Sequence, residues 1–137
     1  MGTPIGSILL GKKDFIKKAR RIRKVLGGGM RQAGYLAAAG IFALENNIGQ
    51  LANDHLHAKM LRDALNKKDF VKNIFPVESN IIIFEVGGRM NARQLAETLA
   101  LHKIRVIDIS ATQVRMVLHL DVSAAMVQQA IEVIDQL

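Results

Sequence analysis

Apolar and polar positions in the second half of the chain switch between a strand-like and a helix-like period. The elements expected from these patterns are strands at 69–75, 80–86, 104–109 and 113–120 and helices at 91–102 and 123–137. Asn91 is suited to cap the first of these helices, and Asp121 and Ser123 introduce the second. The order strand, strand, helix, strand, strand, helix predicts an α+β fold, with helices on one face of a mostly antiparallel sheet.

The first half of the chain follows helical spacing. The expected helices are 12–26, 30–47 and 48–65. The first carries Phe15 and Ile22 on one face and many charges on the other, which is typical of a basic amphipathic helix. The second is apolar almost all round, so we expect it to be buried between layers. On or near the buried side of the third we expect Leu51, His55, Met60 and Leu61.

One further apolar run, PIGSILL at residues 4–10, is bounded by Pro4 and Gly11 and predicts a short buried strand. A lone strand cannot satisfy its own backbone hydrogen bonds. We therefore expect it either to join the sheet of the second half or to belong to a sheet whose other strands lie outside this sequence.

Composition narrows the class of protein. Half of the 137 residues are hydrophobic and none is cysteine, which excludes a disordered tail, a disulfide scaffold and a thiolate site. No apolar run is long enough to span a bilayer, and the start lacks the basic residues of a signal peptide. We expect a soluble, cytoplasmic protein that does not bind a membrane.

The net charge of +7 is unevenly distributed along the chain. Residues 1–31 contain nine of the 19 Lys and Arg and one acid, Asp14, so this segment has a net charge of +8 and the other 106 residues have a net charge of −1. Any attraction for anions is therefore expected at the front of the chain.

A glycine run, Gly27–Gly29, lies inside this basic segment. Glycines before a helix leave backbone N–H groups free, and these N–H groups together with the helix dipole favour an anion such as phosphate. Lys24 before the run and Arg31, expected in the first turn of the next helix, add positive charge. The alternative is a flexible hinge with solvated charges, since no GxxxxGK pattern is present.

Arg115 is a lone arginine in an apolar strand. Alternation places Val114 and Met116 on one face of the strand and Arg115 on the other. A buried arginine needs a carboxylate or phosphate partner, and its planar fork suits a carboxylate. The alternative is an edge-strand arginine paired with Asp108 or Glu85.

Other chemistry is poorly supported by the sequence. His55 and His57 are two residues apart on a helix and point to different faces, and His102 and His119 are isolated, so we predict no metal site. No Ser-His-Asp arrangement stands out. Nucleic-acid binding through residues 12–31 is the weakest hypothesis because few aromatic residues accompany the basic cluster.

Three stretches of the sequence are similar to one family. GTPIGSILLG, RIRKVLGGGMRQAGYLAAAGIFALENN and RMVLHLDVS resemble the low-specificity L-threonine aldolases, pyridoxal-phosphate enzymes with the aspartate-aminotransferase-type α/β fold. The resemblance covers the whole chain but only the C-terminal portion of the family. It implies that residues 1–47 are the end of the large cofactor domain with bridging helices, and that 48–137 form the small α+β domain.

The resemblance also implies roles for individual residues. Lys24, Gly28, Gly29 and Arg31 match the positions that face the cofactor phosphate, and Arg115 matches the arginine that grips the α-carboxylate of the amino acid. The Schiff-base lysine of the family lies in SKGLGTP, upstream of the match to Gly2. This sequence begins after that position, so no residue of the chain is predicted to be catalytic.

The function implied by the resemblance is that of the C-terminal fragment of an aldolase. The full enzyme would cleave L-threonine or L-allo-threonine to glycine and acetaldehyde with pyridoxal phosphate. We expect the fragment alone to be inactive and to bind no cofactor, and to form a homo-oligomer or to pair with a companion N-terminal chain. The alternative is a non-catalytic interaction or oligomerisation module that retains an anion site.

Overall fold

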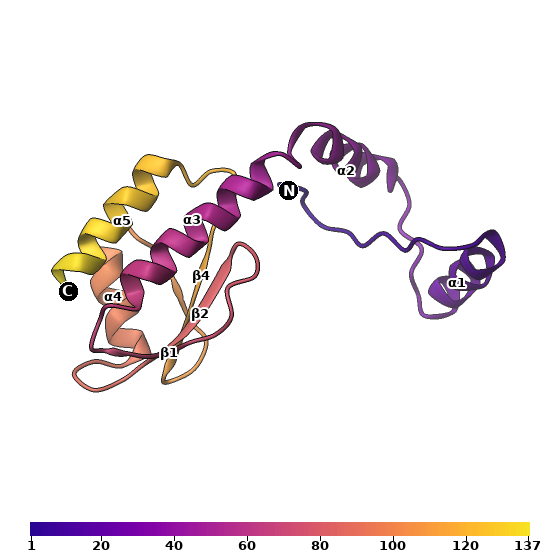
Figure 1. The fold of residues 1–137 in the computed structure, drawn as a ribbon. Coiled ribbons are helices and arrows are strands. Elements are labelled where there is room, and N and C mark those ends of the chain that lie inside the picture. Colours follow the sequence, from indigo (N-terminus) through magenta and orange to yellow (C-terminus); the bar gives the residue numbers. More distant parts are fainter. The chain divides into compact units, whose positions relative to one another are not determined.

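The computed structural model describes all 137 residues, and these divide into two compact units (Figure 1). One unit comprises residues 2–47, and the other comprises residues 48–137 together with Met1. No helix in either unit is both long enough and apolar enough to cross a membrane.

Residues 2–47 contain two helices, α1 (Lys13–Val25) and α2 (Gly34–Asn46). Residues 4–10 form neither a strand nor a part of the sheet, so the expectation that this run joins the sheet of the second half is wrong. Without a neighbouring strand, the backbone groups of 4–10 have no ladder to join.

The helix α2 is largely exposed, which corrects the expectation that it is buried between layers. Only Ala43 is buried, while Tyr35 is 83% and Phe42 is 62% exposed. The helix α1 has no buried residue. Residues 2–47 therefore present apolar side chains that nothing in this unit covers.

Residues 48–137 confirm the predicted α+β class. The elements are α3 (Gln50–Leu65), β1 (Val71–Ile74), β2 (Ile81–Val86), α4 (Ala92–Leu101), β3 (Ile107–Asp108), β4 (Gln113–Val117) and α5 (Ala124–Gln136). The strand predicted at 104–109 is reduced to two residues in β3. The other predicted strands and helices of this half are present with shifts of one to three residues at their ends.

The four strands form one sheet in the order β1-β2-β4-β3, and every neighbouring pair is antiparallel. In this order β4 is an interior strand, with β2 on one side and β3 on the other. Residues of β4 therefore have cross-strand neighbours on both sides.

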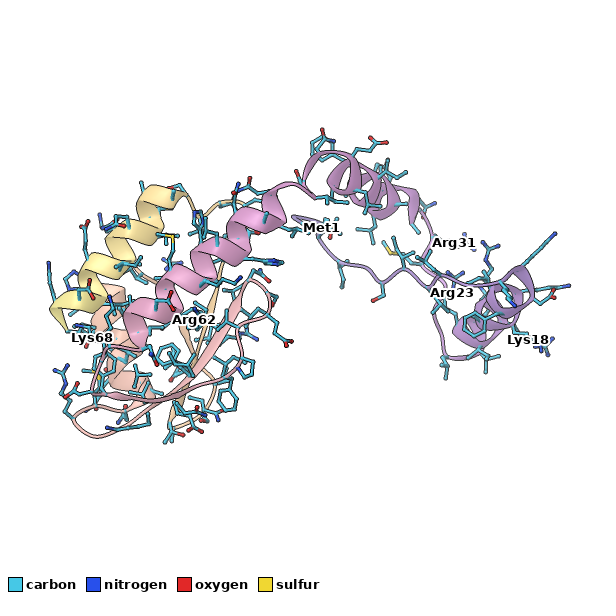
Figure 2. All side chains as sticks on the ribbon, in the orientation of Figure 1. Met1, Lys18, Arg23, Arg31, Arg62 and Lys68 are labelled. Atoms are coloured by element: carbon cyan, nitrogen blue, oxygen red, sulfur yellow. The ribbon has the colours of Figure 1, made fainter.

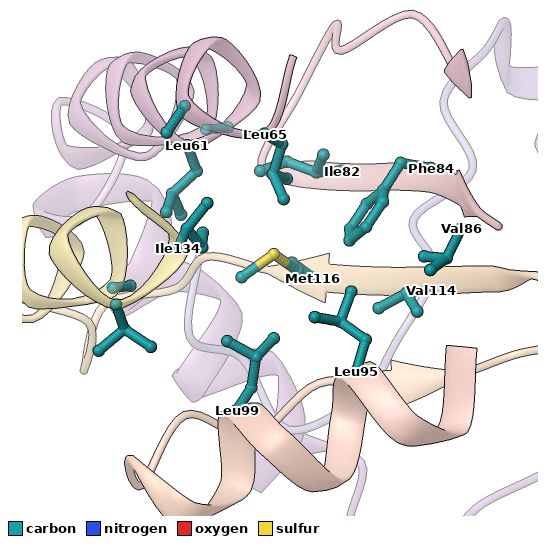
Figure 3. Close-up of a cluster of buried hydrophobic side chains, with 14 of the residues drawn as sticks. Leu61, Leu65, Ile82, Phe84, Val86, Leu95, Leu99, Val114, Met116 and Ile134 are labelled. Carbon is teal, nitrogen blue, oxygen red and sulfur yellow. The ribbon is translucent and has the colours of Figure 1, made fainter. Parts of the chain in front are cut away.

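The core lies between one face of this sheet and the three helices α3, α4 and α5 (Figures 1 and 3). Ile82 and Phe84 of β2 and Val114 and Met116 of β4 project into it. The helices contribute Leu61, Leu65, Leu95, Leu99 and Ile134. Apolar side chains at every second strand position thus form one face of the sheet, as its period of two requires.

Helix α3 only partly follows the buried face that was predicted for it. Leu61 is buried as expected, and Leu51 and His55 are half-buried, but Met60 is 38% exposed. The buried positions of the helix are Asp54, Ala58, Leu61, Ala64 and Leu65. Their spacing of three and four residues is that of a single helical stripe, and Met60 lies beside it.

Two predicted helix caps are confirmed. The side chain of Asn91 accepts a hydrogen bond from the N–H of Gln94 at 2.9 Å, and the Gln94 side chain accepts one from the N–H of Asn91 at 2.9 Å, which makes a capping box. The Ser123 hydroxyl accepts from the N–H of Met126 at 3.3 Å at the start of α5.

Removing the Asn91 cap tests how much this box stabilises the second unit. Asn91→Ala should lower the free energy of unfolding by about 1 kcal/mol, because a backbone N–H at the start of α4 loses its acceptor. Urea denaturation followed by circular dichroism measures the change. Asn66→Ala is the matched control, since the exposed Asn66 side chain makes no hydrogen bond; an equal loss in both variants would contradict the prediction.

Candidate functional site

Arg115 lies in the interior strand β4, on the face of the sheet that the helices leave uncovered. Its neighbours on either side of it in the strand, Val114 and Met116, are buried in the core, so its own side chain points away from the core. In the strand register Arg115 is directly opposite Ile83 on one side and Ile107 on the other. A lone guanidinium therefore lies between two isoleucines in the middle of a sheet.

No carboxylate of the protein pairs with Arg115. Asp108 is opposite Val114, so its side chain belongs to the other face. Glu85 is opposite Gln113 and accepts a hydrogen bond from its amide at 3.3 Å. The alternative of an edge-strand arginine paired with Asp108 or Glu85 is thus wrong. β4 is not an edge strand, Asp108 lies on the other face, and Glu85 is hydrogen-bonded to Gln113.

The Nε atom of Arg115 is buried and has no hydrogen-bond acceptor in the protein. A buried, charged N–H donor destabilises the protein unless it has a hydrogen-bond acceptor. Carboxylates match the guanidinium fork with two parallel hydrogen bonds. The geometry of this face is therefore suited to an anionic ligand, and to a carboxylate above all.

The glycine run ends α1 in a way that uses two of its N–H groups. The Gly28 N–H donates to the Arg23 carbonyl at 2.7 Å and the Gly27 N–H to the Lys24 carbonyl at 3.1 Å. Together with the φ of +82° at Gly27, these bonds make a Schellman motif. The expectation that glycines before a helix leave backbone N–H groups free is therefore wrong for Gly27 and Gly28.

The expected position of Arg31 in the first turn of a helix is also wrong. Helix α2 begins at Gly34, and Arg31 lies before it in a turn where Gln32 has a φ of +51°. From Gly29 to Ala33, however, no backbone N–H donates to another protein group. The free donors are thus displaced along the chain, from the glycines to the turn that follows them.

The structure brings Lys24 and Gly29 together. A Cβ atom on Gly29 would lie 3.0 Å from Lys24 Nζ, so the ammonium lies against this glycine. The side chains of Lys24 and Arg31 are exposed and form no ion pair, and those of Arg23 and Arg31 are visible in Figure 2. Cations beside free backbone donors favour an anion such as phosphate.

Comparison with known proteins assigns the chain to a family. Residues 1–88 match the model of the beta-eliminating lyases, and this region includes the glycine run and Arg31. The chain belongs to the beta-eliminating lyase family.

The proteins to which this chain is similar include threonine aldolases. The chain is 36% identical to low-specificity L-threonine aldolase 1 of Arabidopsis thaliana over 99% of its own length and 39% of that protein. It is 44% identical to the low specificity L-threonine aldolase of Escherichia coli K12 over 90% of its length and 35% of that protein. The match lies in the C-terminal part of these relatives, and the chain spans little more than a third of their length.

The other titratable side chains form no metal site and no pH-sensitive site. No three His, Asp or Glu side chains lie close enough together to hold a metal ion. The pKa of Arg93 is raised because its guanidinium donates to Glu97 at 3.0 Å and feels the charges of Glu97 and Asp108. Arginine is protonated at every pH at which this protein folds, so the raised pKa creates no pH switch.

Substitution at Gly28 tests the Schellman motif at the end of α1. A Cβ at Gly28 would lie 2.6 Å from Arg23 Cγ and 2.9 Å from the Arg23 carbonyl oxygen. Gly28→Ala should therefore break the bond between residues 28 and 23 and raise the hydrogen-exchange rate of the residue 28 amide about fivefold or more, since this bond is worth about 1 kcal/mol.

The control for this measurement is Gly34→Ala, because a Cβ at Gly34 meets no atom within 4 Å. Exchange at residue 28 should be unchanged in this variant. Unchanged exchange at residue 28 in Gly28→Ala would show that the close approach to Arg23 does not restrict this position.

Proposed function

We propose that this chain is the C-terminal part of a pyridoxal-phosphate-dependent threonine aldolase that cleaves L-threonine or L-allo-threonine to glycine and acetaldehyde. One observation carries the proposal: Arg115 lies between two isoleucines and has no protein partner, in a chain with relatives that are named threonine aldolases. An amino-acid substrate brings the carboxylate that this guanidinium lacks.

Arg115 holds the α-carboxylate of the amino acid in this proposal. Ile83 and Ile107, on either side of it in the register, flank the ion pair with apolar side chains, which strengthens it. Holding the carboxylate fixes the orientation of the α-carbon and its substituents. Positioning of this kind lowers the activation free energy of the reaction, because the entropy of aligning the reacting groups is lost on binding and not in the chemical step.

The phosphate end of the cofactor is assigned to residues of the first unit. Lys24 and Arg31 supply charge, and Gly29 lets the Lys24 ammonium approach the backbone. Gly28 acts through shape, since its N–H is committed to Arg23 and a side chain would not fit there. Pyridoxal phosphate, when bound, supplies the electron sink for breaking the carbon–carbon bond.

The two units take different parts in the proposed enzyme. Residues 1–47 complete a large cofactor domain and bridge it to the small domain of residues 48–137. The apolar side chains that α1 and α2 expose in this chain support the first assignment, since exposed apolar surface of this extent marks an interface. Their partner is a companion N-terminal polypeptide or a second copy of the same chain.

A chimera tests the proposed function. This chain replaces the matching C-terminal part of the Escherichia coli low specificity L-threonine aldolase, and glycine release from L-threonine is measured. The proposal expects a chimera that binds pyridoxal phosphate and releases glycine. A folded chimera that retains the cofactor but releases no glycine contradicts it.

Two substitutions in the chimera separate the proposed substrate role of Arg115 from the proposed cofactor role of Arg31. Arg115→Ala should raise the KM for L-threonine roughly 10- to 150-fold, because lost charge-assisted hydrogen bonds cost about 1.5–3 kcal/mol. Arg31→Ala should instead weaken cofactor binding up to about fivefold, as expected for one exposed charge. Arg93→Ala is the control, since its guanidinium already pairs with Glu97. Equal effects of Arg115→Ala and Arg93→Ala on KM would contradict the role of Arg115.

The chain by itself provides a further prediction. It should self-associate at micromolar concentration, because the apolar side chains of α2 need cover, and it should release no glycine from L-threonine when pyridoxal phosphate is added. Sedimentation velocity and a glycine assay measure the two properties. A clean monomer would count against the interface, and turnover would count against the assignment of catalysis to residues outside this chain.

The alternative function is a non-catalytic interaction module that keeps an anion site. The exposed apolar surface of residues 2–47 favours it, since that surface serves association without any chemistry. The chimera distinguishes the two functions. A module that only associates would assemble with the Escherichia coli part and leave it inactive.

A further inference from the structure

A cavity of about 310 Å³ lies within residues 48–137, and Arg115 does not line it. Most of its wall is apolar and comes from α3, the end of β4, the segment that follows β4 and α5: Leu61, Met116, Leu118, Val122, Val127 and Ala130. Two methionines, Met116 and Met126, are among the residues around it. The volume is at the lower end of the range for small-molecule sites, and methionine side chains adapt to apolar ligands of different shape.

One side of this cavity is basic. His102, Lys103 and Arg105, from the segment after α4, line it together with the apolar walls. None of the three takes part in an ion pair, and no Asp or Glu lines the cavity. The cavity therefore joins an apolar interior to uncompensated positive charge.

Lys103 adopts a backbone conformation that lysine rarely takes. It follows the C-cap of α4 in a Schellman motif, with its N–H donating to the Ala100 carbonyl at 2.9 Å and the Ile104 N–H donating to the Leu99 carbonyl at 3.0 Å. Its φ is +64°, and glycine is the usual residue at this position. Left-handed backbone at a non-glycine residue is strained, and such strain gathers at ligand-binding positions.

We propose that this cavity binds amphipathic monocarboxylates, with the apolar chain inside and the carboxylate against Lys103 and Arg105. The lining without acids and the two unpaired cations, Lys103 and Arg105, favour an anionic head, and the walls favour an apolar chain. The strained lysine is then explained, because glycine would relieve the backbone but remove the charge. The proposal does not depend on the aldolase function, since Arg115 does not line the cavity.

Octanoate is the probe, titrated into the ¹⁵N-labelled chain with amide shifts followed by NMR. Saturable shifts are expected at 102–105 and along α5. Two controls separate the parts of the ligand: 1-octanol has the chain without the charge, and acetate has the charge without the chain. Both should bind at least about fivefold more weakly than octanoate.

Variants test the basic side of the cavity. The double variant K103Q/R105Q should bind octanoate roughly tenfold more weakly, since each exposed charge contributes up to about fivefold. The control K67Q removes an exposed lysine that does not line the cavity and should bind as the parent does.

A third variant, K103G, separates charge from backbone strain. It should raise the melting temperature, because glycine tolerates the positive φ, and at the same time bind octanoate about fivefold more weakly. Since this variant is stabilised, its weaker binding cannot come from unfolding.

Three results would overturn the proposal. They are octanoate shifts confined to residues 2–47 or absent altogether, equal affinity for octanoate and 1-octanol, and unchanged octanoate affinity in folded K103Q/R105Q. The second result would leave an apolar cavity without anion recognition, and the third would place the carboxylate elsewhere.

Discussion

The burial of one sheet face beneath α3, α4 and α5 is the constraint on which the rest of this structure depends. Because side chains alternate along a strand, Val114 and Met116 can enter the core only if Arg115 points to the opposite face. A register slip of one residue would bury the charge and expose both apolar side chains. The packing of the core thus keeps an arginine on a face where the protein offers it no carboxylate.

Two helices of this chain end in the same backbone motif but place different residues in its left-handed position. Both α1 and α4 end in a Schellman motif, which satisfies carbonyl groups of the last turn. At α1 the left-handed residue is Gly27, and at α4 it is Lys103. Glycine takes this conformation without strain, whereas lysine does not, and the lysine is the one that lines a cavity. Local strain and a charged lining therefore coincide at one place in the small unit.

The first unit exposes apolar side chains and an excess of positive charge. Its helices present apolar residues such as Phe42, and its basic residues have almost no acids to offset them. Repulsion between like charges and exposed apolar surface both favour association with another polypeptide. The beta-eliminating lyase relatives are more than twice as long as this chain, which fits a surface made to be covered.

The sequence by itself determined the α+β class, the order of strands and helices in residues 69–137 and the caps at Asn91 and Ser123, because these follow from local periodicity and short-range hydrogen bonds. The aldolase resemblance rested on motifs in the same way. Only the tertiary structure decided that β4 is an interior strand, that Arg115 has no partner and that residues 4–10 form no strand. It also showed that the N–H groups of Gly27 and Gly28 donate hydrogen bonds to carbonyl groups of α1. Strand order and hydrogen-bond partners depend on residues far apart in the chain or on the exact backbone path, and neither can be read from local pattern.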